Sequence, residues 1–203
     1  MSLRSTGAAA ALLASLLLSG CDPFQPAPGV RDTAAMQAWT ARQAQLRNLD
    51  QWALTGRAAA SGNFGLKGSL RWVQRGDRFT LDVRGPFGIG AARLDGTPQR
   101  VVVRSGKQEW ITNEPEELLL QEFGWTLPVR ALRYWVVGLP APGPVADFQV
   151  DTRGRITQLA QADWTVAYAD YAAQPLIELP GQLRAEQGDT TLKLSIDRWD
   201  LPQ

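Results

Sequence analysis

Apolar and polar residues alternate with a period of two along eleven short segments of this chain. In the last segment, Leu192, Leu194 and Ile196 share one parity. Residues two apart project from the same face of a strand, so the pattern predicts half-buried strands, and the Gly-, Asn- and Asp-containing turns between them favour antiparallel pairing. The predicted strands span residues 52–60, 66–75, 78–84, 89–95, 100–105, 107–112, 146–152, 155–161, 163–171, 177–186 and 190–199, with Gly96-Thr97-Pro98 as the turn after the fourth.

Three other segments have helical periodicity. Residues 32–48 repeat apolar side chains at steps of three, four and seven, behind Asp32 as the predicted N-cap. Asn113 and Glu116 resemble a capping box at the start of a second helix, and Gly124 suits its end. A third helix begins at Pro128, and its apolar stripe contains Leu132, Trp135, Val136 and Leu139.

The number of strands limits the architecture. A single twisted sheet of about eleven strands must curl, and one layer of helices can cover its concave face without filling it. We therefore predict a mainly β, α+β fold: an unclosed, strongly curved antiparallel β-barrel with a helical lid. The pattern leaves open whether the interior is packed or hollow, because core and cavity positions are equally apolar, and the eight tryptophans fit either.

The first twenty residues are typical of an export signal. Arg4 precedes an apolar run from Ala8 to Leu18, which is shorter than the roughly 20 residues of a membrane-spanning helix. Leu18-Ser19-Gly20-Cys21 resembles a bacterial lipobox, in which the cysteine is acylated after the signal is cleaved. An ordinary signal peptide with a chance cysteine is the alternative, but Cys21 is the only cysteine in the chain. We expect Cys21 to be the lipid attachment site.

The signal peptide and the cysteine that follows it divide the chain into three parts. Residues 1–20 are the lipoprotein signal peptide, and residues 21–31 are the acylated N-terminus with a proline-rich, extended tether. Residues 32–203 form one folded domain. The tether allows that domain to stand off the membrane.

The composition excludes much familiar chemistry. The chain has no histidine, no GxxxxGK[ST] phosphate loop and no GxSxG elbow, and its 21 Lys and Arg residues against 20 Asp and Glu residues argue against nucleic acid as a partner. Glu114, Glu116 and Glu117 could hide a carboxylate pair, but a solvated first helical turn is the simpler interpretation. We expect no catalytic residue, no metal site and no cofactor.

An apolar hairpin tip lies between the third and fourth predicted strands, where polar residues are usual. The segment Pro86, Phe87, Gly88 and Ile89 carries two bulky apolar side chains among glycines and a proline. Phe87 either folds back over the barrel mouth or protrudes towards a bilayer or lipid chain. The residue chemistry favours protrusion of Phe87.

Taken together, these features resemble the LolB family of outer-membrane lipoprotein receptors of Gram-negative bacteria. The most distinctive element is Leu132-Arg133-Tyr134-Trp135-Val136-Val137-Gly138-Leu139-Pro140, after the acidic helix, and the likeness covers essentially the whole mature chain. Cys21 matches the acylated cysteine, and Phe87 matches the protruding apolar residue that family members use for insertion, which is leucine in more familiar members. The resemblance therefore implies that Pro86, Phe87, Gly88 and Ile89 form a membrane insertion loop. Asp22 departs from the pattern, because aspartate after the lipidated cysteine marks inner-membrane retention in enteric-type sorting.

The resemblance implies a hydrophobic cavity that receives acylated lipoproteins from the periplasmic carrier LolA before their insertion into the outer membrane. Burying one ~16-carbon chain is worth on the order of 12 kcal/mol at about 0.8 kcal/mol per CH₂. We expect a lipid-anchored monomer on the periplasmic side of the outer membrane, whose partners are the carrier, acylated cargo and phospholipid. The predicted acyl-chain lining is Leu54, Leu70, Trp72, Phe79, Leu81, Trp110, Trp135 and Val136.

Two other classes of protein remain open from the sequence. One is a structural or assembly lipoprotein of the envelope, with a packed core and no lipid cargo. The other is a carboxylate-dependent envelope hydrolase, which would lose activity on substitution of a single Asp or Glu.

Overall fold

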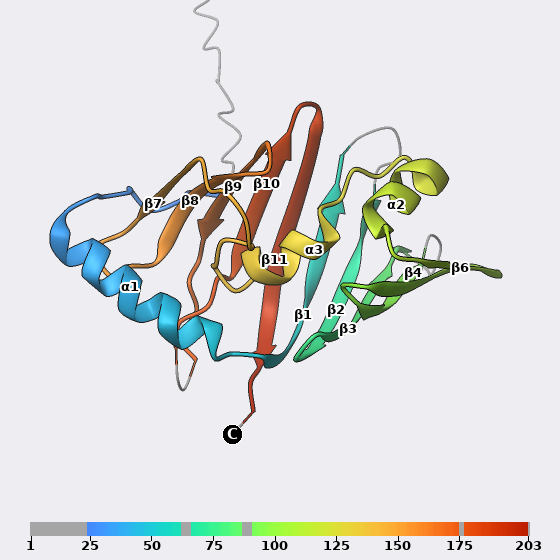
Figure 1. Ribbon diagram of the computed structural model, residues 1–203, viewed down its shortest axis with the longest axis horizontal. Coiled ribbons are helices and arrows are strands. Elements are labelled where there is room, and N and C mark those ends of the chain that lie inside the picture. Colours follow the sequence, from blue (N-terminus) through green and yellow to red (C-terminus); the bar gives the residue numbers. More distant parts are fainter. Residues whose placement is uncertain (1–23, 62–65, 87–90, 175–176, 203) are drawn as a thin grey trace, which may run out of the picture.

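A computed structural model of the protein describes residues 24–61, 66–86, 91–174 and 177–202. These residues form one antiparallel sheet of eleven strands in the order β6-β5-β4-β3-β2-β1-β11-β10-β9-β8-β7. The first six strands make one half, the last five make the other, and β1 joins the halves by pairing with β11. Strands β6 and β7 end the sheet, so the barrel is unclosed (Figure 1).

The strands confirm the predicted number, and most confirm the predicted positions. Their bounds are β1 Gln51–Ala60, β2 Leu66–Arg75, β3 Arg78–Arg84, β4 Ala92–Thr97, β5 Arg100–Ser105, β6 Gln108–Thr112, β7 Asp147–Val150, β8 Ile156–Gln161, β9 Trp164–Ala169, β10 Gln182–Gln187 and β11 Thr190–Asp200.

The predicted fourth strand, 89–95, is placed too early, and its turn is wrong. The observed β4 runs through Gly96 to Thr97, and the chain reverses at residues 98–99. Gly96 pairs with Phe79 on one side and Val101 on the other. A Cβ at this position would overlap the carbonyl of Arg100. Gly96 therefore allows β4 and β5 to approach closely and is not part of the turn.

The predicted tenth strand, 177–186, also begins too early. Strand β10 starts at Gln182, while Leu179 makes only an isolated bridge to Ala172. Pro180 lies between these two elements and has no N–H to donate, so the ladder cannot continue through it.

The helix α1 (Thr33–Arg47) has the predicted N-cap. The backbone N–H of Ala35 donates to Oδ1 of Asp32 at 2.7 Å. The buried face of α1 contains Trp39, whose ring lies 5.8 Å from that of Phe148 in β7. Just before α1, the N–H of Val30 donates to the carbonyl of Val150 at 2.6 Å, so the end of the predicted tether is attached to the same strand.

The helices α2 (Pro115–Phe123) and α3 (Val129–Trp135) follow β6. Gly124 ends α2 in the left-handed conformation, and Pro128 is the N-cap of α3, as predicted. The predicted capping box is wrong, because the N-cap is Glu114 and it makes no side-chain cap. The Glu116 carboxylate instead accepts a hydrogen bond of 2.9 Å from the backbone N–H of Arg130, which joins α2 to α3.

All three helices lie along one face of the sheet (Figure 1). Their buried side chains join those of both sheet halves in a single hydrophobic cluster. The two sheet halves and the lid therefore share one core, which places the apolar candidate residues between the sheet and the helices.

Candidate functional site

A continuous row of apolar side chains crosses the helix-covered face of the sheet. Each member lies directly opposite the next on the neighbouring strand, and the row runs over seven strands, from β11 through β1 to β6. Cross-strand neighbours of this kind pack against one another, so the row forms an uninterrupted apolar floor. It consists of Trp199, Leu54, Trp72, Leu81, Leu94, Val103 and Trp110.

The structure brings the predicted lining residues together. Leu54, Trp72, Leu81 and Trp110 lie in the row itself, and all eight lining residues belong to the hydrophobic cluster or pack against it. The buried members are Leu54, Leu70, Trp72, Phe79, Trp135 and Val136, whereas Leu81 and Trp110 are half-buried.

The lid covers this floor with aromatic contacts. The ring of Phe123 in α2 meets the edge of Trp110 at 5.4 Å and stacks on Trp125 at 5.0 Å. Trp135 in α3 is fully buried and lies 6.2 Å from Trp164 in β9. The helices thus contact both halves of the sheet through bulky, rigid rings.

Beside Trp72, the space between the floor and the helices is small. A void bounded by Trp72, Phe79, Val101, Pro115 and Val129, among others, has a volume of about 10 Å³, close to the ~10–15 Å³ that one water molecule needs. Pockets for small-molecule ligands measure roughly 300–1,000 Å³. At this place the void is too small for an acyl chain while the side chains of α2 and α3 keep their positions.

Two open grooves lie beside the lid. Their volumes are about 510 Å³ and 460 Å³, and both are lined by Arg133, Tyr134 and residues 141–143. Arg133 forms an ion pair of 3.0 Å with Asp77 in the turn between β2 and β3. The helix α3 and the segment after it therefore separate solvent-filled space from the apolar floor.

Gln161 in β8 is a functional candidate that the sequence analysis missed. Its Oε1 accepts hydrogen bonds from Nε1 of Trp135 at 3.0 Å and from the backbone N–H of Ala141 at 2.9 Å. Its Nε2 donates to the carbonyls of Ala141 at 2.8 Å and Pro144 at 3.3 Å. Gln161 thus ties the lid to the sheet, and nothing in its sequence context distinguishes it from a solvent-exposed strand glutamine.

The clearest pKa shifts of buried groups lie away from the apolar row, beneath α1. Burial raises the pKa of Tyr171, whose hydroxyl donates to the carbonyl of Ile156 at 2.7 Å. The guanidinium groups of Arg42 and Arg155 lie 5.4 Å and 5.0 Å from the Tyr171 ring centroid, and burial lowers the pKa of Arg42. These contacts attach α1 to β8.

The acidic residues at the start of α2 have a structural role in the described part of the chain. Glu114 and Glu116 both form ion pairs with Arg130 at the start of α3. Across the residues that the structure describes, no group of three or more His, Cys, Asp or Glu side chains is placed to hold a metal ion. Within those same ranges, no helix combines the length and apolarity needed to cross a bilayer.

Part of the predicted site lies outside the described residues. Cys21, Phe87, Gly88 and Ile89 are not among the described residues, whereas Pro86 is described and exposed. Pro86 lies two residues after the end of β3 and is the residue immediately before Phe87.

The fold and the apolar floor define a class of protein, namely a lid-covered half-barrel with a hydrophobic interior. Residues 50–199 match the family described as "Outer membrane lipoprotein LolB". The chain is 41% identical over 194 residues to the outer-membrane lipoprotein LolB of Nitrosococcus oceani, covering 94% of this chain and 95% of that relative. It is 39% identical over 194 residues to the LolB of Halorhodospira halophila, covering 94% of this chain and 93% of that relative.

The chain therefore belongs to the LolB family of outer membrane lipoproteins, which confirms the resemblance drawn from the sequence. Among solved structures, it is similar to a LolA superfamily protein from Nitrosomonas europaea, with a TM-score of 0.46 and 8% identity over 76% of this chain and 87% of that one.

Proposed function

We propose that this protein is a lipid-anchored receptor on the periplasmic side of the outer membrane. It accepts acylated lipoproteins from a LolA-type carrier and inserts them into the membrane as a monomer. The observation that carries the proposal is the apolar row over seven strands beneath a helical lid. The family of outer membrane lipoproteins to which the chain belongs gives it further support.

The closed interior determines how cargo enters. The lid rings that pack on the floor occupy the space an acyl chain would take, so binding exchanges lid contacts for contacts with the chain. Burying a ~16-carbon chain at about 0.8 kcal/mol per CH₂ is worth on the order of 12 kcal/mol, which can offset the lost lid packing. Without a nucleotide-binding loop in the sequence, transfer runs downhill in affinity, and each tenfold bias requires about 1.4 kcal/mol.

The membrane anchor and the insertion of cargo are assigned to Cys21 and to the loop around Phe87, and both of these residues lie outside the described segments. Cys21 carries the acyl anchor after removal of residues 1–20, and residues 21–31 tether the domain 32–203 to the membrane. The segment Pro86, Phe87, Gly88 and Ile89 perturbs the bilayer during release of the cargo. Exposure of Pro86 is consistent with a protruding tip.

A reconstituted transfer assay tests this proposal. A radiolabelled acylated lipoprotein is passed from the carrier to the protein and then to outer-membrane vesicles. We expect Phe87→Glu to retain acceptance of cargo but to lose insertion. Ile111→Glu is the matched control, because it places the same charge on an apolar side chain that is 56% exposed elsewhere, and it should retain both steps. Unchanged insertion by Phe87→Glu would show that the loop has no insertion role.

A second candidate function is a structural envelope lipoprotein with a permanently packed core. The near absence of free space beneath the lid favours it. Native mass spectrometry of the purified protein distinguishes the two candidates. A receptor should retain acyl-chain ligands, or take them up when they are added, whereas a packed structural protein should do neither.

A further inference from the structure

A third groove, of about 680 Å³, lies across the middle of the sheet. Lys67, Lys193 and Arg57 line it and are exposed, and their strand neighbours Ala58 and Leu194, which also line it, have buried side chains. Because successive side chains of a strand point to opposite faces, these cations project from the face opposite the helices. We call this the basic groove; its cations are Arg57, Lys67, Arg84 and Lys193.

The register places the cations of the basic groove in rows with small residues between them. Ala59 lies directly opposite Lys193 on one side and Lys67 on the other. In the neighbouring row Ser69 lies opposite both Arg57 and Arg84. The small side chains leave room between positive charges that converge from four strands.

The basic groove has almost no compensating negative charge. Among the described residues that line it, none carries a carboxylate side chain. Arg57 pairs with Asp197 at 3.1 Å, but within the described ranges no ion pair involves Lys67, Arg84 or Lys193. Cations two strands apart repel one another, and an anion held between them would relieve this repulsion.

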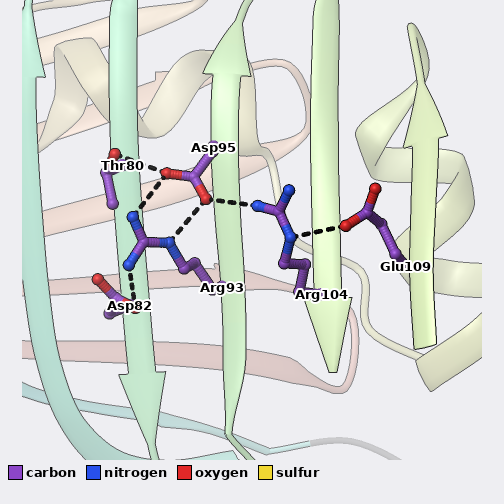
Figure 2. A network of polar contacts seen from close by, with 6 residues as sticks. All are labelled: Thr80, Asp82, Arg93, Asp95, Arg104 and Glu109. Carbon is purple, nitrogen blue, oxygen red and sulfur yellow. Dashed lines mark hydrogen bonds and ion pairs between the residues drawn. The ribbon is translucent and has the colours of Figure 1, made fainter. Parts of the chain in front are cut away.

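The outer half of the sheet, strands β3 to β6, shows the opposite arrangement. There Arg93 and Arg104 alternate with acidic partners, and Asp95 bridges them at 2.7 Å and 3.0 Å (Figure 2). Glu109 completes the network at 2.7 Å from Arg104. The described part of the chain therefore neutralises the arginines of β4 and β5 and, in the basic groove, pairs Arg57 but not Lys67, Arg84 or Lys193.

The basic groove lies between the two segments proposed to reach the membrane. Phe24 lines it and is three residues from Cys21, a separation of about 10 Å at most for an extended chain. Gly85 and Pro86 also line it, and Phe87 is the next residue. An acyl anchor on Cys21 and an apolar tip at Phe87 would both leave the protein beside these cations.

We propose that the basic groove binds the headgroup phosphates of anionic phospholipids when the protein sits on its membrane. The guanidinium and ammonium groups supply charge and hydrogen-bond donors for phosphate, and the hydroxyl group of Ser195, which accepts from Arg57, can supply a further donor. This contact fixes the orientation of the domain on the bilayer. The inference rests on the proposed function, because it takes Cys21 to be acylated and the loop after Pro86 to meet the membrane.

The test uses the complete acylated protein, reconstituted into phosphatidylethanolamine vesicles with or without phosphatidylglycerol. An environment-sensitive fluorophore is placed in the groove through Ser69→Cys, and iodide quenching reports its exposure. The control label is placed through Gln99→Cys, an exposed position in the turn between β4 and β5. We expect phosphatidylglycerol to shield the label at residue 69 and not the label at residue 99, and raised salt to weaken the shielding.

Charge-reversal variants identify the cations responsible. Lys67→Glu with Lys193→Glu should abolish the shielding, since each cation removed lowers the ratio of docked to undocked protein by about fivefold. The matched control, Arg78→Glu with Lys107→Glu, makes the same change of charge outside the groove and should retain the shielding. Circular dichroism and thermal unfolding establish that both pairs are folded.

Other outcomes overturn the inference. Equal shielding in both kinds of vesicle, or shielding that survives Lys67→Glu with Lys193→Glu, contradicts headgroup binding. If adding the carrier or the cargo shields the label at residue 69 on vesicles of phosphatidylethanolamine alone, the groove binds an acidic protein and not lipid headgroups. Transfer of labelled cargo in the same vesicles is scored separately, so loss of transfer with intact shielding refutes the proposed function and leaves the headgroup contact standing.

Discussion

Trp135 in α3 donates a hydrogen bond from its indole Nε1 to Oε1 of Gln161 in β8 over 3.0 Å, and both residues are buried. The same glutamine holds Ala141, six residues further along the chain, through both its backbone N–H and its carbonyl. The Gln161 side chain therefore hydrogen-bonds both α3 and the segment after it to the C-terminal half of the sheet. We expect the strength of these hydrogen bonds to affect how readily α3 moves away from the apolar floor.

Gln161→Leu should destabilise the fold by about 2–4 kcal/mol, since it leaves Trp135 Nε1 and the backbone groups of Ala141 without partners in a buried place. Urea unfolding measures the change. Gln158→Leu is the matched control, because Gln158 lies in the same strand and is exposed, so its effect should stay within about 0.5 kcal/mol. Equal effects of the two substitutions would contradict the role of Gln161.

The ion pair between Arg133 and Asp77 fastens the other side of α3 at 3.0 Å. Arg133→Ala should make the apolar floor more accessible with little loss of stability, within about 1 kcal/mol, because Asp77 is well exposed. Stopped-flow uptake of an apolar fluorescent dye measures the opening, and we expect it to be faster than in the unmodified protein. An unchanged rate would mean that α3 does not limit access.

The polar network on the outer face of β3 to β6 gives a dependence on pH (Figure 2). The hydrogen bond from Arg93 lowers the pKa of Asp95, with smaller contributions from Thr80 and the nearby positive charges that outweigh its partial burial. Because the pKa of Asp95 is lower in the folded protein than its ordinary value of about 3.9, its ionised form stabilises the fold when the pH is above that ordinary value. This stabilisation is lost as the pH falls through the lowered pKa.

Asp95→Asn should therefore be less stable than the unmodified protein near neutral pH, and the difference should shrink as the pH falls below about 4. Urea unfolding over this range measures it. Asp189→Asn is the control, because Asp189 forms no ion pair within the described residues, and its difference should be smaller throughout. A difference for Asp95→Asn that grows in acid would contradict the assignment.

Gly154 fixes the position of α1. Its φ is +69°, and a Cβ there would overlap the backbone of Ala38 and Trp39. Gly154→Ala should cost about 1–2 kcal/mol in backbone strain and a further ~1–3 kcal/mol in overpacking. Gly188→Ala has a similar φ of +53° with open space around the new Cβ, so thermal unfolding should show only the strain. Equal losses of stability in the two variants would mean that α1 can shift away from residue 154 without destabilising the fold.

The sequence was sufficient for local structure and for the family, but not for the state of the interior. Period-two alternation identified eleven strands, because each strand has one buried and one solvated face. It misplaced β4 and β10, where Gly96 continues a strand and Pro180 delays one, since these depend on neighbours distant in the sequence. Leu54 and Trp72 were expected in the lining and lie opposite each other, yet the alternation could not show that their surroundings are filled.

The central claim is that the lid opens to admit acyl chains onto the apolar floor, and site-specific photo-crosslinking tests it most directly. A photoreactive amino acid replaces either Trp72, which is buried beneath the lid, or Arg71, its neighbour on the exposed face of β2. During transfer of a lipoprotein labelled in its acyl chains, position 72 should crosslink to the chains and position 71 should not. No crosslink from position 72, or equal crosslinking from both, would contradict the claim.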